Sequence, residues 1–199
     1  MWFAWRIRVQ RVGPGEERAN SEEITFLRVA EAEIGADLSG QVQSLLQDCF
    51  PGYPDRSYFK LPPHFRYLAM TSDGVVAAQM GVELRVIRVG DSVVRTFGVV
   101  DLCVRQGERS RGLASGLLAE VTGLARACRI DFLILFADDE RLYVRNGWAR
   151  VRNRCSWVKI DDHTTLGLAR QADPDAMMVK AIGARAWPEG DVDLLGHLF

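Results

Sequence analysis

A stretch of backbone suited to binding a phosphate group lies between Gly107 and Gly112, where the sequence reads Gly-Glu-Arg-Ser-Arg-Gly. It connects a strand-like apolar run to a helix-like one, so its unpaired backbone N–H groups would lie at the start of a helix. Such a start carries partial positive charge and binds anions, and Arg109 and Arg111 add full charges beside it. Gly112 has no Cβ to block a close approach. The segment therefore predicts a site for a phosphate-bearing ligand.

The hydrophobic pattern around this segment predicts the elements that would position it. Alternating apolar residues and two turn signals predict an antiparallel meander with strands at 65–71, 75–89 and 92–104. The segment then leads into an amphipathic helix at 111–128. A fully apolar strand follows at 131–137, of the kind that is buried in parallel pairing. The strand-helix-strand unit requires a right-handed parallel crossover, so the fold class is a mixed α/β arrangement.

The hydrophobic patterns in the other segments are less regular but still predict helices and strands. The expected elements are a strand at 24–30, a helix at 38–50, a short helix at 138–148, and strands at 156–160 and 176–182. Residues 1–23 are expected to form a flexible lead-in or an extra strand. Residues 24–199 are expected to form one domain that ends in a tail at 185–199.

Composition limits the classes of protein that fit this chain. The 199 residues are 48% hydrophobic and 26% charged, which is typical of a soluble globular domain. A net charge of −1 provides no overall attraction to nucleic acid or to an acidic membrane. The four cysteines and three histidines are scattered, so neither a disulfide framework nor a metal site is predicted. The histidines are expected in loops or at the surface, and free thiols favour a cytoplasmic protein.

Two short motifs resemble one protein family. The run from Arg109 to Ala114 fits the R/Q-x-x-G-x-G/A signature of the GNAT superfamily of acyl-CoA-dependent N-acyltransferases. The run from Leu142 to Trp148 resembles the later L-Y-x-x-x-G-F element of the same family, and the predicted helix and apolar strand separate the two motifs as the family requires. The resemblance covers roughly residues 24–160. It implies a mostly antiparallel sheet with flanking helices and one parallel strand pair that splays apart.

The same resemblance implies acetyl-CoA, or another acyl-CoA, as co-substrate, with no metal. The backbone of the strand end would bind the pantetheine arm, as an added strand would, through Leu102, Cys103 and Val104. The signature residues would bind the pyrophosphate, namely Arg109, Ser110, Arg111, Gly112, Leu113 and Ala114.

The chemistry that the family implies is direct attack of an amine on the thioester, which needs a proton acceptor and a proton donor. Tyr143 lies at the family's donor position, and a phenol with a pKa of about 10 can protonate a departing thiolate. Asp101 is the only acid in the central strand and is the candidate acceptor; the alternative is a buried carboxylate that binds backbone. Cys103 is disfavoured as a covalent nucleophile because no histidine lies near it in sequence.

The acceptor is predicted from the end of the chain. The Trp-Pro-Glu-Gly-Asp-Val run resembles the ending of aminoglycoside 2'-N-acetyltransferases, and the layout also resembles nodulation-factor N-acyltransferases. Carboxylates beside an aromatic ring would suit a cationic amino sugar, so Trp187, Glu189 and Asp191 are candidate substrate-binding residues. The alternative is a solvated acidic tail. This tail also continues past Val192, which departs from the pattern of the aminoglycoside enzymes.

Three functions fit these observations. The first is N-acetyl transfer to a small-molecule amine, with neither nucleic acid nor membrane as partner and with a homodimer left open. The second is a catalytically silent module that binds acyl-CoA. The third is peptide or protein N-acetylation, which predicts an open groove between residues 51–63 and the late strands.

Overall fold

A mixed sheet forms the centre of the structure, a computed structural model that describes residues 23–174 and 177–199. The predicted lead-in therefore lies almost wholly outside the described residues. The strands are β1 (Thr25–Ala30), β2 (Phe65–Met70), β3 (Val76–Val89), β4 (Ser92–Val104), β5 (Phe132–Phe136), β6 (Ala149–Arg150), β7 (Arg154–Asp161), β8 (Thr164–Ala172), β9 (Met177–Ala181) and β10 (Val192–His197). The helices are α1 (Ala36–Cys49), α2 (Leu113–Ala127) and α3 (Arg141–Arg145), with 3-10 turns at Glu31–Glu33 and Gln106–Glu108.

The sheet contains the predicted meander and the predicted parallel pair. Its order is β6-β9-β5-β4-β3-β10-β7-β8, and β2 and β1 continue from the other part of β3. β2, β3 and β4 pair antiparallel, and β4 pairs parallel with β5 through the α2 crossover. The turn signals that follow β2 and β3 therefore end these strands where the sequence predicts. The predicted mixed sheet of the GNAT fold is confirmed.

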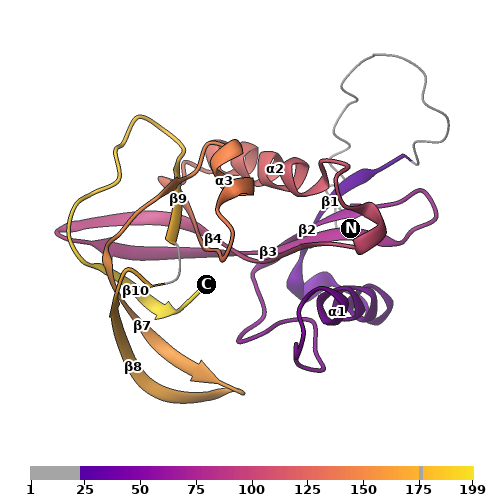
Figure 1. Ribbon diagram of the computed structural model, residues 1–199, viewed down its shortest axis with the longest axis horizontal. Coiled ribbons are helices and arrows are strands. Elements are labelled where there is room, and N and C mark those ends of the chain that lie inside the picture. Colours follow the sequence, from indigo (N-terminus) through magenta and orange to yellow (C-terminus); the bar gives the residue numbers. More distant parts are fainter. Residues whose placement is uncertain (1–22, 175–176) are drawn as a thin grey trace, which may run out of the picture.

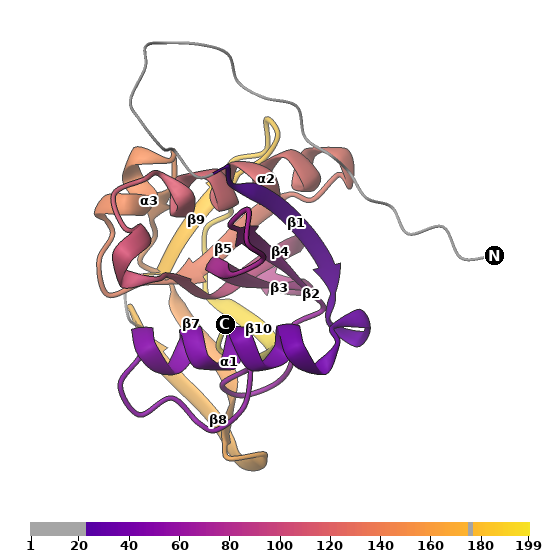
Figure 2. The same ribbon diagram turned by 90° about the vertical axis from the view of Figure 1, so that its right-hand side faces the viewer.

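The helices cover both faces of the sheet. α2 and α3 lie on one face and α1 lies on the other, as Figures 1 and 2 show. The apolar stripe of α2 includes Leu113, Leu117 and Val121, which pack with residues of β2, β3 and β5 in the largest core cluster. α1 covers a smaller cluster through Val42, Leu45 and Leu46. Among the described residues, no helix is long and apolar enough to cross a membrane.

The end of the chain is a strand, where the sequence predicts a tail at 185–199. β10 lies between β3 and β7, antiparallel to the first and parallel to the second. β8, which the sequence analysis omits, pairs with β7 as a hairpin. β10 carries a weak local signal because its partners lie far away in sequence. β8 is exposed along nearly its whole length, so it lacks the apolar alternation of a half-buried strand. β10 brings the last residues of the chain beside the middle of β3, where they become part of the candidate site.

The apolar contacts of α2 with the sheet should be the main interaction that positions the segment from Arg109 to Gly112. Leu117 is fully buried, so Leu117→Ala should reduce the free energy of unfolding by about 2–5 kcal/mol, as measured by urea denaturation. Leu166→Ala on exposed β8 is the matched control and should cost less than about 0.5 kcal/mol. Equal losses in the two variants would contradict the packing described for α2.

Candidate active site

A β-bulge interrupts the pairing of β4 with β3 at Asp101. In the register of β3 and β4, Met80 lies opposite two residues, Asp101 and Leu102. Asp101 has a positive φ of 53°, a left-handed conformation that aspartate tolerates better than most residues. β4 pairs with β5 only at residues 96–98, so past Gly98 the two strands part. The splayed parallel pair that the family resemblance implies is therefore present.

A chain of polar side chains holds the bulge in place. The carbonyl oxygen of Asp101 accepts a hydrogen bond from the Gln79 side-chain amide. The Gln79 side-chain oxygen in turn accepts from Arg66, at 3.0 Å from Nη1. Arg66 is fully buried and also donates to Glu31 at 2.7 Å and to the Ser57 carbonyl at 2.6 Å. The guanidinium thus links β1's end, β2 and the loop at 51–64 to the bulge.

The segment from Arg109 to Gly112 has the geometry of an anion site. It follows the 3-10 turn at Gln106–Glu108 and ends at Gly112, which caps α2 with a φ of 78°. The first backbone N–H groups of α2 have no partner within the helix. A Cβ on Gly112 would meet no atom within 4 Å, so the space beside Gly112 is open. Arg109 Nε donates to the Val104 carbonyl oxygen at 3.3 Å, which ties the segment to the end of β4.

Tyr143 lies on α3, which packs against the same core face as α2. Its ring makes an edge-on contact with Trp148, with 5.9 Å between the ring centroids. Burial raises the pKa of Tyr143 to about 12, and the charges of Asp138 and Asp139 act in the same direction. The phenol therefore keeps its proton at neutral pH and can serve only as a donor there.

Asp101 directs its carboxylate away from the sheet toward the 51–64 loop. Its Oδ2 accepts a hydrogen bond from the Tyr53 hydroxyl at 2.7 Å. Burial raises the pKa of Asp101 above its ordinary value, while the Tyr53 hydrogen bond and the charges of Arg66 and Lys60 oppose that rise. A carboxylate in this state accepts a proton more readily than an exposed aspartate.

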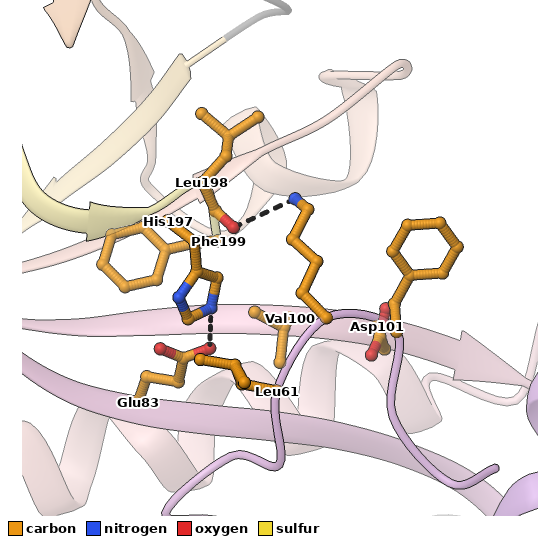
Figure 3. A pocket seen from close by; sticks show the side chains of 9 residues that line it. Leu61, Glu83, Val100, Asp101, His197, Leu198 and Phe199 are labelled. Atoms are coloured by element: carbon orange, nitrogen blue, oxygen red, sulfur yellow. Dashed lines mark hydrogen bonds and ion pairs between the residues drawn. The ribbon is translucent and has the colours of Figure 1, made fainter. Parts of the chain in front are cut away.

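A pocket of about 210 Å³ opens beside the bulge, and we call it the acceptor pocket (Figure 3). It lies between the 51–64 loop, the middle of β3 and β4, and the end of β10. The residues that line it are Phe59, Lys60, Leu61, Glu83, Val100, Asp101, His197, Leu198 and Phe199. Of the residues predicted for the site, Asp101 alone lines this pocket.

A buried charged cluster forms one wall of the acceptor pocket. His197 Nε2 lies 3.1 Å from Glu83 Oε1, and Arg85 contacts both residues. Burial disfavours the charged form of Glu83, but the His197 hydrogen bond and the charge of Arg85 outweigh it, so the pKa of Glu83 is lowered. From the sequence, His197 is expected in a loop or at the surface, and this prediction is wrong. His197 is 8% exposed because β10 inserts beside β3.

The 51–64 loop is tied to the β7–β8 hairpin. Arg56 Nη1 forms an ion pair with Asp162 at 2.9 Å, and the Tyr58 hydroxyl lies 3.3 Å from His163 Nε2. Lys60 Nζ also donates to the Leu198 carbonyl oxygen at 3.1 Å. These three contacts bridge the groove that peptide acetylation would require between the early loop and the late strands.

The structure does not bring Trp187, Glu189 and Asp191 to this pocket. Trp187 Nε1 donates to Asn153 at 3.0 Å, and the Asp191 carbonyl oxygen accepts from Gly90 N at 2.8 Å. Glu189 and Asp191 lie beside Gly90 in the β3–β4 turn, and Trp187 packs edge-on against Phe132. At about 3.3 Å per residue of strand, that turn is on the order of 30 Å from the bulge. The part of the tail that reaches the pocket is its end, from His197 to Phe199.

Cys103 is a poor nucleophile in this fold. It is buried at 6% exposure, and contact with the Cys49 thiol together with burial raises its pKa. The same contact and the nearby Arg109 guanidinium lower the pKa of Cys49 to about 6. Cys103 contributes its backbone to the edge of β4, which fits the role that the family resemblance implies for it.

A family model for the acetyltransferase (GNAT) domain matches residues 34–151, more than half of the chain. The chain belongs to the GNAT acetyltransferase family. The match spans the bulge, the signature segment and Tyr143. This enzyme is therefore an acyl-CoA-dependent N-acetyltransferase. No curated protein matches the sequence.

Solved structures share the fold of this GNAT acetyltransferase at low sequence identity. The GNAT family N-acetyltransferase YhbS from Escherichia coli, in complex with CoA, matches with a TM-score of 0.63 and 16% identity over 90% of this chain and 93% of that chain. A GNAT family acetyltransferase from Brucella melitensis, in complex with acetyl-CoA, matches with a TM-score of 0.54 and 14% identity over 84% and 94%. Eis1 from Mycobacterium abscessus matches with a TM-score of 0.53 and 16% identity, over 67% of this chain and 32% of that chain.

The residues present in this GNAT acetyltransferase fit acyl-CoA as a co-substrate. The edge of β4 beyond Gly98 has no β5 partner, and the N-terminus of α2 faces open space. A pantetheine arm can pair with such a strand edge, and a pyrophosphate can bind such a helix N-terminus. Both features lie on the same side of the bulge as α2 and α3.

A large side chain at the start of α2 should block cofactor binding. Gly112→Trp should weaken acetyl-CoA binding by on the order of a hundredfold in calorimetric titration, because the indole would fill the open space in front of the amides. Gly167→Trp is the matched control, since Gly167 also has a positive φ and open surroundings but lies on β8. Unchanged affinity in Gly112→Trp would refute the phosphate assignment.

Proposed function

We propose that this acetyltransferase transfers an acetyl group from acetyl-CoA to the primary amine of a small molecule bound in the acceptor pocket. The observation that carries this proposal is the position of Asp101. Its carboxylate lines the pocket, and its backbone forms the bulge at which β4 leaves β5. An amine held in the pocket would lie between a proton acceptor and the gap between the strands.

In this proposal the signature segment and the strand edge hold the cofactor. Backbone groups of residues 102–104 pair with the pantetheine arm, and residues 109–114 bind the pyrophosphate. Acetyl-CoA supplies the thioester whose carbonyl carbon the amine attacks. Tyr143 gives a proton to the departing sulfur, since the phenol carries its proton throughout the neutral range.

Asp101 is the proposed proton acceptor. An amine must lose its proton before it can attack, and a carboxylate with a raised pKa takes that proton with less cost than an ordinary aspartate. The Tyr53 hydrogen bond fixes one carboxylate oxygen, which leaves the other free to face the pocket. Glu83 has the lowered pKa of a carboxylate held in an ion pair, so it suits charge stabilisation better than proton transfer.

The size and closure of the pocket favour a small acceptor over a peptide. Its volume of about 210 Å³ is below the roughly 300–1,000 Å³ that is typical of drug-sized ligands. The 51–64 loop is tied to the β7–β8 hairpin by the Arg56–Asp162 ion pair. Asp101 supplies negative charge for a cationic amine, whereas Glu83 is already paired with Arg85 and His197. An amino sugar is the leading subclass, and it would be recognised by these residues in place of the predicted tail residues.

The proposal is tested by calorimetric titration with acetyl-CoA, followed by an assay of thiol release across a panel of amines. The panel contains aminoglycosides, glucosamine, polyamines and short peptides. We expect acetyl-CoA to bind and thiol release to occur with one class of small amine. Turnover with peptides alone would refute the small-molecule assignment. Binding without turnover on any amine would favour the silent module.

Removal of the Tyr143 hydroxyl should separate turnover from binding. Tyr143→Phe should lower kcat by about a hundredfold or more and leave the Kd for acetyl-CoA nearly unchanged, because the phenol acts on the leaving sulfur. Tyr67→Phe removes a buried phenol from the same core cluster and should leave kcat unchanged. A loss of binding that matches the loss of kcat would assign Tyr143 a structural role.

Removal of the Tyr53 hydroxyl should move the pH profile. The Tyr53 hydrogen bond lowers the pKa of Asp101, so Tyr53→Phe raises that pKa further. Since the reaction needs the ionised carboxylate, the acid limb of kcat/KM should shift to higher pH. Tyr58→Phe, on the same loop but directed at His163, should leave the limb in place. A shift to lower pH, or no shift, would contradict the role of Asp101.

A further inference from the structure

The acceptor pocket already contains a primary amine that belongs to the chain. Lys60 lies on the 51–64 loop, is half-buried, and lines the pocket together with Asp101 of the bulge. Its Nζ donates to the Leu198 carbonyl oxygen at 3.1 Å, the upper dashed line in Figure 3. The amine is therefore held at the pocket by a hydrogen bond to the end of the chain.

The charges around Lys60 are those that an external amine would meet. Burial lowers the pKa of Lys60 and the charge of Arg85 lowers it further, whereas Asp101 and Glu83 oppose the change. A larger share of Lys60 is consequently the free amine than for an exposed lysine. The free amine is the form that attacks a thioester.

We propose that Lys60 is an internal acceptor, which the enzyme acetylates from acetyl-CoA when no external amine fills the pocket. This inference rests on the acetyl transfer proposed above. The lone pair of Lys60 Nζ attacks the thioester carbonyl carbon, so a C–N bond forms and the C–S bond breaks. The proton lost by the amine passes to Asp101, and the departing sulfur takes a proton from Tyr143, so the products are an amide and the CoA thiol.

Acetylation of Lys60 would change the pocket that contains it. The lysine would lose its positive charge, and the acetyl group would take up space beside Asp101 and Glu83. An external amine competes for the same space, so its presence should slow the modification. Self-acetylation would therefore report on whether the pocket is filled.

The sequence makes this inference easy to test, because it contains three lysines, Lys60, Lys159 and Lys180. The purified full chain is incubated with acetyl-CoA, and peptide mass spectrometry measures acetylation at each lysine over time. We expect Lys60 to be modified on the order of a hundredfold faster than the other two, because the fold positions it next to the proposed transfer site.

Lys180 and Lys159 are internal controls. Burial also lowers the pKa of Lys180, but its Nζ donates to the Asn146 carbonyl oxygen at 2.8 Å and does not line the pocket. Lys159 lies exposed on β7. Reactivity caused by a low pKa alone would modify Lys180 as well as Lys60. Lys60→Arg should abolish the fast phase, whereas Lys180→Arg should leave it unchanged.

The outcomes separate this inference from the proposed function. Rapid acetylation confined to Lys60, slowed in Tyr143→Phe and in Gly112→Trp, would support it. Equal, slow labelling of all three lysines would indicate uncatalysed acetylation and would overturn the inference. Thiol release with an external amine while Lys60 stays unmodified would also overturn it and leave the proposed function standing. No binding of acetyl-CoA would refute both.

Discussion

The hydrogen-bonded chain from Arg66 through Gln79 to the backbone of Asp101 is the interaction on which the site depends. β4 stops pairing with β5 after Gly98, although β5 continues for two residues to Phe136. A left-handed residue in a strand costs free energy, and a fully buried guanidinium that lost a partner would cost about 3–5 kcal/mol. Straightening β4 at Asp101 would relieve the left-handed conformation but would break the hydrogen bonds that link Arg66 and Gln79 to it. The bulge is therefore the more stable arrangement.

The bulge at Asp101 shapes the structure on both faces of the sheet. On the side of α2, the unpaired edge of β4 and the N-terminus of the helix lie in line for an extended ligand that carries phosphates. On the other side, the carboxylate of Asp101 faces a pocket that the 51–64 loop and β10 complete. In the proposed function, the cofactor and the acceptor approach the same point from opposite directions, which direct transfer between them requires.

Local patterns predicted the parts of the fold that depend on local interactions. The meander follows from alternation and turns, and the segment from Arg109 to Gly112 follows from a strand end, glycines and a helix start. The bulge at Asp101 depends on Arg66, which is 35 residues earlier in sequence than Asp101, so no local signal marks it. The entry of His197 into the pocket depends on the pairing of β10 with β3, whose register is set by distant residues. No sequence motif marks Lys60 as a site residue. Its place in the pocket follows from the position of the 51–64 loop beside the bulge.

The position of the CoA sulfur in a crystal structure of the complex would test this account most directly. We expect the pantetheine arm to lie along β4 at residues 102–104, with the sulfur in the gap beside the bulge and within hydrogen-bonding reach of the Tyr143 hydroxyl. The acceptor pocket should then open onto the same point. A CoA bound elsewhere, or β4 and β5 paired beyond Gly98 in the complex, would contradict the account.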